Sequence, residues 1–143
     1  MTHIDSSDGA AVLVRAADTE LVGFPPQTVR LLADSSSTGG RLSTQRVTLL
    51  GGADGANPHH HTWSAELFYV LSGSVQLLAG DRLLVAGEAD LAVVPPGLPH
   101  AFAAAAGSDA DLLLVITPDI ERQDHRRVLH TRVHSYRPPR VLT

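Results

Sequence analysis

Turn-forming residues recur mostly every six to twelve positions through the middle of this chain, and their spacing limits what it can fold into. The breaks are Gly39-Gly40, Gly51-Gly52, Asp54-Gly55, Ser72-Gly73, Ala79-Gly80-Asp81, Gly87-Glu88, Pro95-Pro96-Gly97 and Gly107-Ser108-Asp109. Between them lie short apolar runs at 42–50, 66–71, 74–78, 82–86, 91–94, 101–106 and 112–117. Because Gly and Pro interrupt every window long enough for a helix, these runs predict an all-β sandwich or barrel.

The two ends of the chain differ from this middle part. Residues 1 to about 10 have the composition of a loose leader. After Thr117, which can cap a helix, Pro118 suits a first helical position, so we expect a short helix to about His130 and then an extended tail. The expected parts are an N-terminal leader and first strand at 1–23, a β-barrel at 24–117, and a C-terminal helix and extended tail at 118–143.

The composition excludes several classes of protein. A length of 143 residues fits one domain with a real core. The absence of Cys and of Lys excludes disulfides, iron–sulfur clusters, thiolate zinc sites and Schiff-base catalysis. A net charge of −4 gives no general attraction to nucleic acid. Without a secretory signal, or an apolar run near the roughly 20 residues of a membrane helix, we expect a cytoplasmic protein with no membrane partner.

Three consecutive histidines, His59, His60 and His61, follow Asn57-Pro58. In an extended chain alternate side chains share a face, so His59 and His61 are expected to point together and His60 away. Two imidazoles placed in this way form a metal clip. With no cysteine in the chain, further ligands would offer nitrogen or oxygen.

A carboxylate follows at Glu66. Its offset from His61 is odd, so alternation alone would turn it to the opposite face, and it joins the histidines only if the chain bends between Thr62 and Ala65. Along the apolar run that begins there, Phe68 and Val70 share the facing of Glu66. They are expected to form an apolar wall, with core packing as their default role.

A fourth candidate, His100, lies at the exit of the turn Pro95-Pro96-Gly97-Leu98-Pro99. Proline fixes φ and glycine permits unusual values of φ, so this turn can place His100 reproducibly. A rigidly delivered imidazole is what a preorganised metal site requires.

These two stretches resemble the two motifs of the cupin superfamily, and the resemblance extends from about Phe24 to Leu129. His59-x-His61-x4-Glu66-x6-Gly73 is similar to the first motif, and Pro95-x-Gly97-x2-His100 to the core of the second. The closest likeness is to small single-domain cupins similar to quercetin dioxygenases. The resemblance implies a double-stranded β-helix, that is, a jelly-roll barrel. Ala53, Ala89 and Ala104 stand where the family has glycine, glycine and asparagine, which leaves the subfamily open.

By this resemblance the ligands of one divalent metal ion per subunit are His59, His61, Glu66 and His100. Three imidazoles and one carboxylate suit Fe, Zn, Mn, Ni or Cu and leave two octahedral positions for a small molecule. The residues expected to line its pocket are Phe68, Val70, Leu77 and Phe102. Glu66 could also leave the metal and act as a base, an idea familiar in this family.

Three functions remain open at this point, because fold and metal do not fix a reaction. The first is a dioxygenase-like oxidoreductase acting on a small aromatic or enolic molecule. The second is a non-redox cyclase or isomerase, of the polyketide cyclase type. The third is a small-molecule-binding cupin without turnover. The resemblance also implies a homodimer, to which the segment from Val12 to Phe24 or the C-terminal tail could supply contacts.

Overall fold

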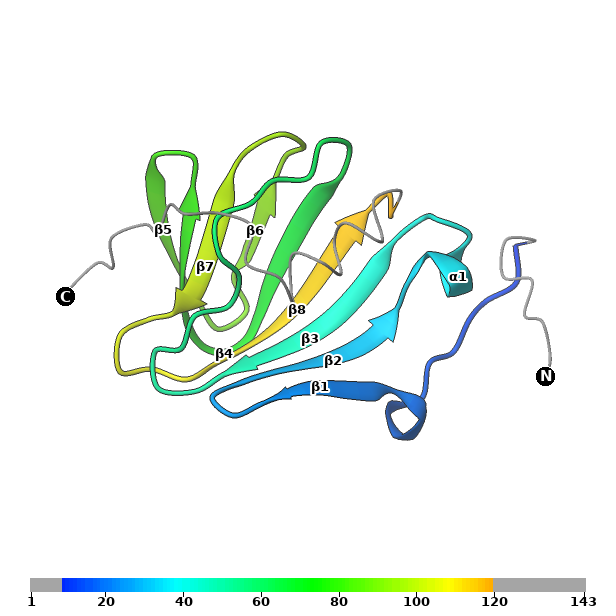
Figure 1. Cartoon of the computed structure of the whole chain (residues 1–143), viewed down its shortest axis with the longest axis horizontal. Helices are drawn as coiled ribbons and strands as arrows, with labels where there is room; N and C mark the ends of the chain where they lie inside the picture. Colours follow the sequence, from blue (N-terminus) through cyan, green and yellow to red (C-terminus); the bar gives the residue numbers. More distant parts are fainter. Residues whose placement is uncertain (1–8, 120–143) are drawn as a thin grey trace.

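The computed structural model describes residues 9–119, and strands dominate this part of the chain (Figure 1). A 3-10 helix, Ala16–Asp18, and a four-residue helix, α1 (Ser35–Thr38), are its helical segments. The strands are β1 (Glu20–Phe24), β2 (Gln27–Ala33), β3 (Ser43–Leu49), β4 (Ala65–Ala79), β5 (Arg82–Gly87), β6 (Leu91–Val94), β7 (His100–Ala104) and β8 (Ala110–Thr117). The expected all-β class is therefore confirmed.

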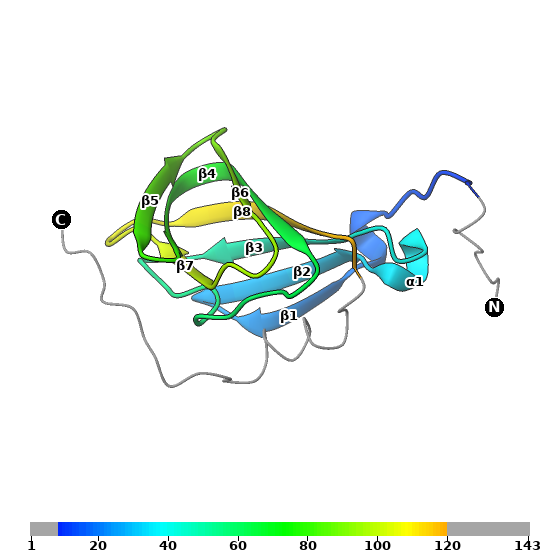
Figure 2. The ribbon, with the colours of Figure 1, turned by 90° about the horizontal axis from the view of Figure 1, so that it is seen from above.

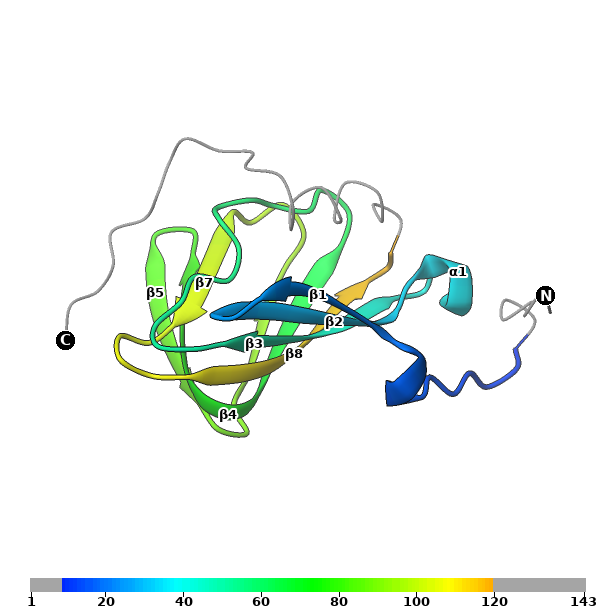
Figure 3. The same ribbon diagram turned by 60° about the horizontal axis from the view of Figure 1, so that its bottom comes forward.

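Every strand pairing is antiparallel, and β4 joins the two sides of the molecule. The order is β1-β2-β3-β8-β4-β5, with β6 and β7 also paired to β4. The first half of β4 pairs with β8 and β6, and its second half pairs with β5 and β7. Because β4 curves, one layer folds back over the other, as Figures 2 and 3 show. The inner faces of both layers enclose the core.

The turn expected at Ser72-Gly73 is wrong, because β4 runs through these residues without a break. The pairing of β4 with β8 shifts register between Val70 and Ser72, as in a β-bulge. Gly73 has φ +82°, and a Cβ atom there would lie 1.9 Å from the carbonyl oxygen of Asp109. The glycine thus serves a close backbone approach inside a strand, a role that sequence alone does not distinguish from a turn.

The other expected runs agree with strands to within about two residues. The expected boundary at 23/24 falls inside β1, which pairs with β2 in a regular hairpin. The helix and tail expected at 118–143 lie almost entirely outside the described residues.

The core comes from alternate residues of the strands. Along β8, Ala110, Leu112, Leu114 and Ile116 are buried, while their neighbours are half-buried. Full burial of such a side chain contributes roughly 1.5–3 kcal/mol to folding. The four residues expected to line a pocket all belong to this core: Phe68, Val70, Leu77 and Phe102. No helix in residues 9–119 is long and apolar enough to cross a membrane.

Candidate metal centre

An extended segment before β4 lies along β7 and brings its histidines to the interior. Hydrogen bonds join the backbones of Ala53 and Ala104, of Gly55 and Phe102, and of His59 and His100. The last pair is reciprocal, with N···O distances of 3.0 and 2.8 Å. This ladder fixes His59 directly opposite His100. Two ligand candidates that lie 41 positions apart in the sequence are therefore neighbours in the fold.

The expected facing of the three consecutive histidines is confirmed. His59 and His61 are buried and His60 is exposed. The chain then bends at Thr62 and Trp63, within the stretch where a bend was required. The amide of Gly97 also donates to the carbonyl oxygen of His61 at 2.7 Å, and this bond joins the segment that carries His59 and His61 to the turn before β7.

The bend allows Glu66 to join the histidines despite its odd offset. Glu66 is the second residue of β4, and with Phe68 and Val70 it faces the interior. His100 opens β7 immediately after the proline-rich turn, in which Gly97 has φ +83°. The four side chains thus come from three elements: the extended segment, β4 and β7.

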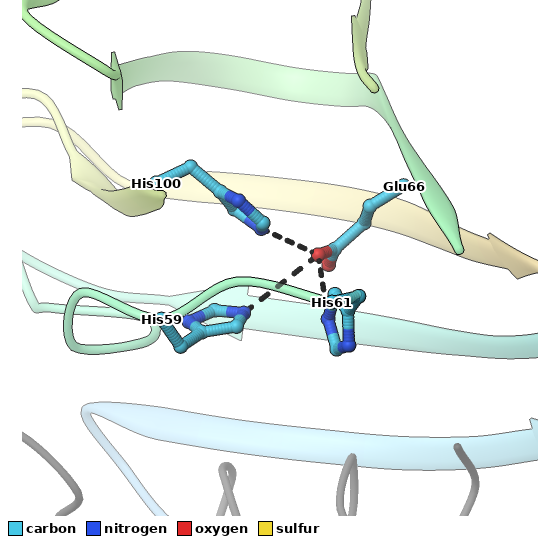
Figure 4. A group of neighbouring side chains, drawn as sticks. All are labelled: His59, His61, Glu66 and His100. Atoms are coloured by element: carbon cyan, nitrogen blue, oxygen red, sulfur yellow. Dashed lines mark hydrogen bonds and ion pairs between the residues drawn. The ribbon is translucent and has the colours of Figure 1, made fainter. Parts of the chain in front are cut away.

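We call His59, His61, Glu66 and His100 the His3Glu cluster (Figure 4). Each member is at least 96% buried, and the four candidate ligand atoms all lie within 4.8 Å of one another. The Nε2 atoms of the histidines converge on Oε1 of Glu66. Their distances from it are 2.7 Å for His100, 3.3 Å for His61 and 3.8 Å for His59.

Backbone carbonyls set the tautomers of two of these imidazoles. The Nδ1–H of His59 donates to the carbonyl oxygen of Asn57 at 2.7 Å, and that of His100 to Leu98 at 2.8 Å. A carbonyl only accepts, so Nδ1 carries a proton in both rings. When the ring is neutral, Nε2 has a lone pair for a metal; in metal-free protein Nε2 donates to Glu66 only when the ring carries a second proton. Metal-binding histidines are oriented in the same way, with the remote nitrogen bonded to a carbonyl or carboxylate.

The pKa of Glu66 reflects two opposed effects. Burial alone raises this pKa, because it disfavours the charged carboxylate. Hydrogen bonds from the three imidazoles, that of His100 foremost, outweigh burial and hold the pKa well below its ordinary value. Glu66 is therefore ionised at neutral pH and ready to act as an oxygen ligand.

This donor set fits one divalent ion. With metal–donor bonds of about 2.1 Å, adjacent donors of an octahedral sphere are roughly 3.0 Å apart and opposite donors roughly 4.2 Å. The candidate ligand atoms of the His3Glu cluster lie within 4.8 Å of one another, a bound slightly wider than the opposite-donor distance, so a small side-chain adjustment would close the sphere. Imidazole nitrogen and carboxylate oxygen together suit iron, zinc, manganese, nickel and copper.

An aromatic wall supports the cluster from the core side. The ring of Phe68 lies edge-on to that of His100, with centroids 5.9 Å apart. Phe102 packs against Phe68 at 5.2 Å. These contacts restrict the rotation of His100, so the apolar residues beside the ligands help to orient them.

Comparison with known proteins identifies the family to which this fold corresponds. The family model for the cupin domain matches residues 45–116, which hold all four members of the cluster. No curated protein sequence matches the chain. Solved structures do match, among them Streptomyces PAC13 with uridine, described as a nucleoside dehydratase. The first of these has a TM-score of 0.66 and 17% identity, over 80% of this chain and 88% of that one.

Two further structures extend the comparison. KdgF from a Halomonas species has a TM-score of 0.66 and 16% identity, over 80% of this chain and 99% of that one. Oxalate decarboxylase of Bacillus subtilis, described by its Mn(II) centres, has a TM-score of 0.64 and 25% identity. That match covers 82% of this chain and 32% of the decarboxylase. The jelly-roll arrangement expected from the sequence agrees with these neighbours.

Proposed function

The chain belongs to the cupin family, and from that premise we propose that it is an enzyme whose His3Glu cluster holds one divalent metal ion. The observation that carries the proposal is the convergence of three imidazole nitrogens on one buried carboxylate oxygen. Two of the imidazoles have their Nε2 lone pairs set for coordination by backbone carbonyls. A buried, ionised carboxylate is stabilised by a balancing positive charge, which a bound divalent ion would supply.

For the reaction we propose dioxygenase-like chemistry on a small aromatic or enolic molecule. An ion bound here would supply a Lewis acid for the oxygens of the substrate and, if it is redox-active, a site for dioxygen. The chain itself contributes a fixed set of donors and the edge-on pair of Phe68 and Phe102, which presents apolar surface beside His100. If Glu66 leaves the metal, its carboxylate would be a candidate to accept a proton from an enolic hydroxyl.

A second candidate is a non-redox reaction such as elimination, cyclisation or isomerisation. The match to PAC13 favours it, because that neighbour is described as a nucleoside dehydratase and dehydration is an elimination that consumes no dioxygen. The same residues would act in both cases. The two candidates differ in whether dioxygen is consumed.

The test combines metal analysis with turnover. Native protein purified without added metal should contain about one equivalent of a divalent ion. The iron-, manganese- and zinc-loaded forms are then incubated with flavonols, catechols and 1,3-diketones in an oxygen electrode and, in parallel, under anaerobic conditions. Oxygen consumption coupled to product supports the dioxygenase. Product formed equally without oxygen supports the non-redox candidate, and tight binding without product supports a binding protein. Absence of any bound metal refutes the proposal.

We also propose that the protein is a homodimer that forms through the outer face of β6, β4 and β8. Two rows of apolar side chains cross these strands: Val93–Leu67–Val115 and Leu91–Tyr69–Leu113. Leu91 and Val93 are 56% and 58% exposed, and the Arg46–Asp111 ion pair borders the patch on β3 and β8. An apolar centre with a polar rim is typical of protein interfaces, and here it fits a second copy of the same face.

Sedimentation equilibrium tests the dimer. Leu91→Glu should give a monomer, whereas Val85→Glu, on the equally exposed but separate β5, should leave the mass unchanged. A native protein with the mass of one chain would refute the proposed interface. The cytoplasmic location expected from the sequence remains a prediction.

A further inference from the structure

The inner face of β3 changes character along its length. Ser43, Gln45, Val47 and Leu49 all face the interior and are buried. The last two are apolar and belong to the core, whereas the first two are polar. Buried polar side chains are uncommon in a barrel wall unless they have a partner, so the buried hydroxyl of Ser43 requires an explanation.

The strand registers place Ser43 level with the metal centre and Gln45 one row further along the inner face. Glu66 pairs with Ile116, and Ile116 with Ser43. One row further, Phe68 pairs with Leu114, and Leu114 with Gln45. Ser43 therefore lies on the same inner row as Glu66, two strands away. Two strand spacings amount to about 10 Å.

The hydroxyl of Ser43 has no hydrogen-bond partner within the described part of the chain. The residue is 94% buried, since its exposed fraction is 6%. A hydroxyl removed from water without a partner lowers stability. Such a group in the interior, facing a site for a ligand, indicates a partner that arrives with that ligand.

We propose that Ser43, with Gln45 beside it, forms a polar subsite for the end of the substrate remote from the metal. The inference rests on the proposed function, and it narrows the substrate class. The substrate would be a small, flat molecule with chelating oxygens at one end and a hydroxyl or carbonyl group at the other. Its middle would pass the apolar side chains of Phe68, Ile116 and Leu114, which lie between the two polar ends.

The experiment uses two matched probes and the zinc-loaded protein, because zinc does not oxidise catechols. Catechol carries only the chelating oxygens, and 3,4-dihydroxybenzyl alcohol adds one distal hydroxyl. We expect calorimetry to show about fivefold tighter binding of the second probe, in the range of one net hydrogen bond. Ser43→Ala should abolish this preference and leave the affinity for catechol and the zinc content unchanged. The control Thr44→Ala alters the neighbouring side chain, which does not belong to the buried set, and should keep the preference.

The outcomes are separable. If neither probe binds although zinc is present, the proposed function and this subsite are both refuted. If both probes bind alike, or if Ser43→Ala weakens both to the same extent, the subsite alone is refuted. Thermal unfolding serves as a second measurement. A subsite hydroxyl without an internal partner predicts that ligand-free Ser43→Ala is at least as stable as the native protein, and a clear loss of stability would indicate a structural role instead.

Discussion

Removal of one imidazole tests the metal centre most directly, and His100→Ala is the change we would make first. Structural zinc sites bind with about 10–16 kcal/mol, so each of four ligands accounts for about 2.5–4 kcal/mol. At 1.4 kcal/mol per tenfold change, loss of His100 should weaken binding by about two to three orders of magnitude. The structure supports a value in the upper part of this range, because His100 is held by a stiff turn, by Leu98 and by Phe68.

The same substitution has a second effect that is independent of metal. His100 makes the shortest contact to the carboxylate of Glu66, at 2.7 Å. Without it, the buried carboxylate keeps His61 at 3.3 Å and His59 at 3.8 Å. Hydrogen bonds to charged groups are worth about 1.5–3 kcal/mol, so the free energy of unfolding of metal-free protein should fall by about that amount.

Both quantities can be measured on one pair of variants. Competition with a fluorescent zinc chelator gives the affinity, and urea unfolding in chelator gives the stability. His60→Ala is the matched control, since His60 is the exposed neighbour of two ligand candidates and should change neither value. Zinc affinity of His100→Ala within about threefold of the native protein would show that the His3Glu cluster is not a metal site.

Three further predictions concern the backbone and the carboxylate. Ala89 has φ +69°, so Ala89→Gly should raise the free energy of unfolding by about 0.5–1 kcal/mol. Ala106 lies in a turn without a positive φ, so the control Ala106→Gly should lower that free energy. Thermal unfolding in which both substitutions change the stability in the same direction would contradict this. Gly73→Ala should lower the free energy of unfolding by more than about 3 kcal/mol, because a Cβ atom there would lie 1.9 Å from a backbone oxygen. Gly97 also has a positive φ but open space around it, so Gly97→Ala should lower that free energy by only about 1 kcal/mol. The lowered pKa of Glu66 means that its ionised form stabilises metal-free protein above the ordinary carboxyl pKa. This contribution is lost as pH falls from the ordinary carboxyl pKa toward the lower folded-state pKa, so Glu66→Gln should unfold with a weaker pH dependence in that acidic range, as urea titrations at each pH would show.

The fold could be predicted from turn spacing because each break that ends a strand carries a residue that strands disfavour. Gly73 shows the limit of that approach. A glycine needed because Asp109 approaches the backbone has the same local sequence signature as a glycine in a hairpin, so the turn pattern predicts two strands where the structure has the single strand β4. Only the pairing of β4 with four other strands shows that it is continuous.

Ser43 and Gln45 illustrate a different limit. Both lie within an expected run, but a single sequence does not tell which face of β3 meets the core when polar residues occupy both sets of positions. Thr44, Arg46 and Thr48 alternate with them, so each face is partly polar. The facing follows from the pairing with β8, where Leu114 and Ile116 stand opposite Gln45 and Ser43.

The metal centre was predictable to different degrees because its members are positioned by different forces. The facing of His59 and His61 follows from local alternation, which holds in any extended chain, and here backbone pairing with β7 keeps that chain extended. Glu66 depends on a bend at Thr62 and Trp63, and no local rule for those residues requires a bend. The bend follows from tertiary constraints, since the segment before it must pair with β7 while the strand after it must pair with β8 and β6. Two sets of pairing partners on different layers force the chain to turn between them, and this turn carries the carboxylate to the imidazoles.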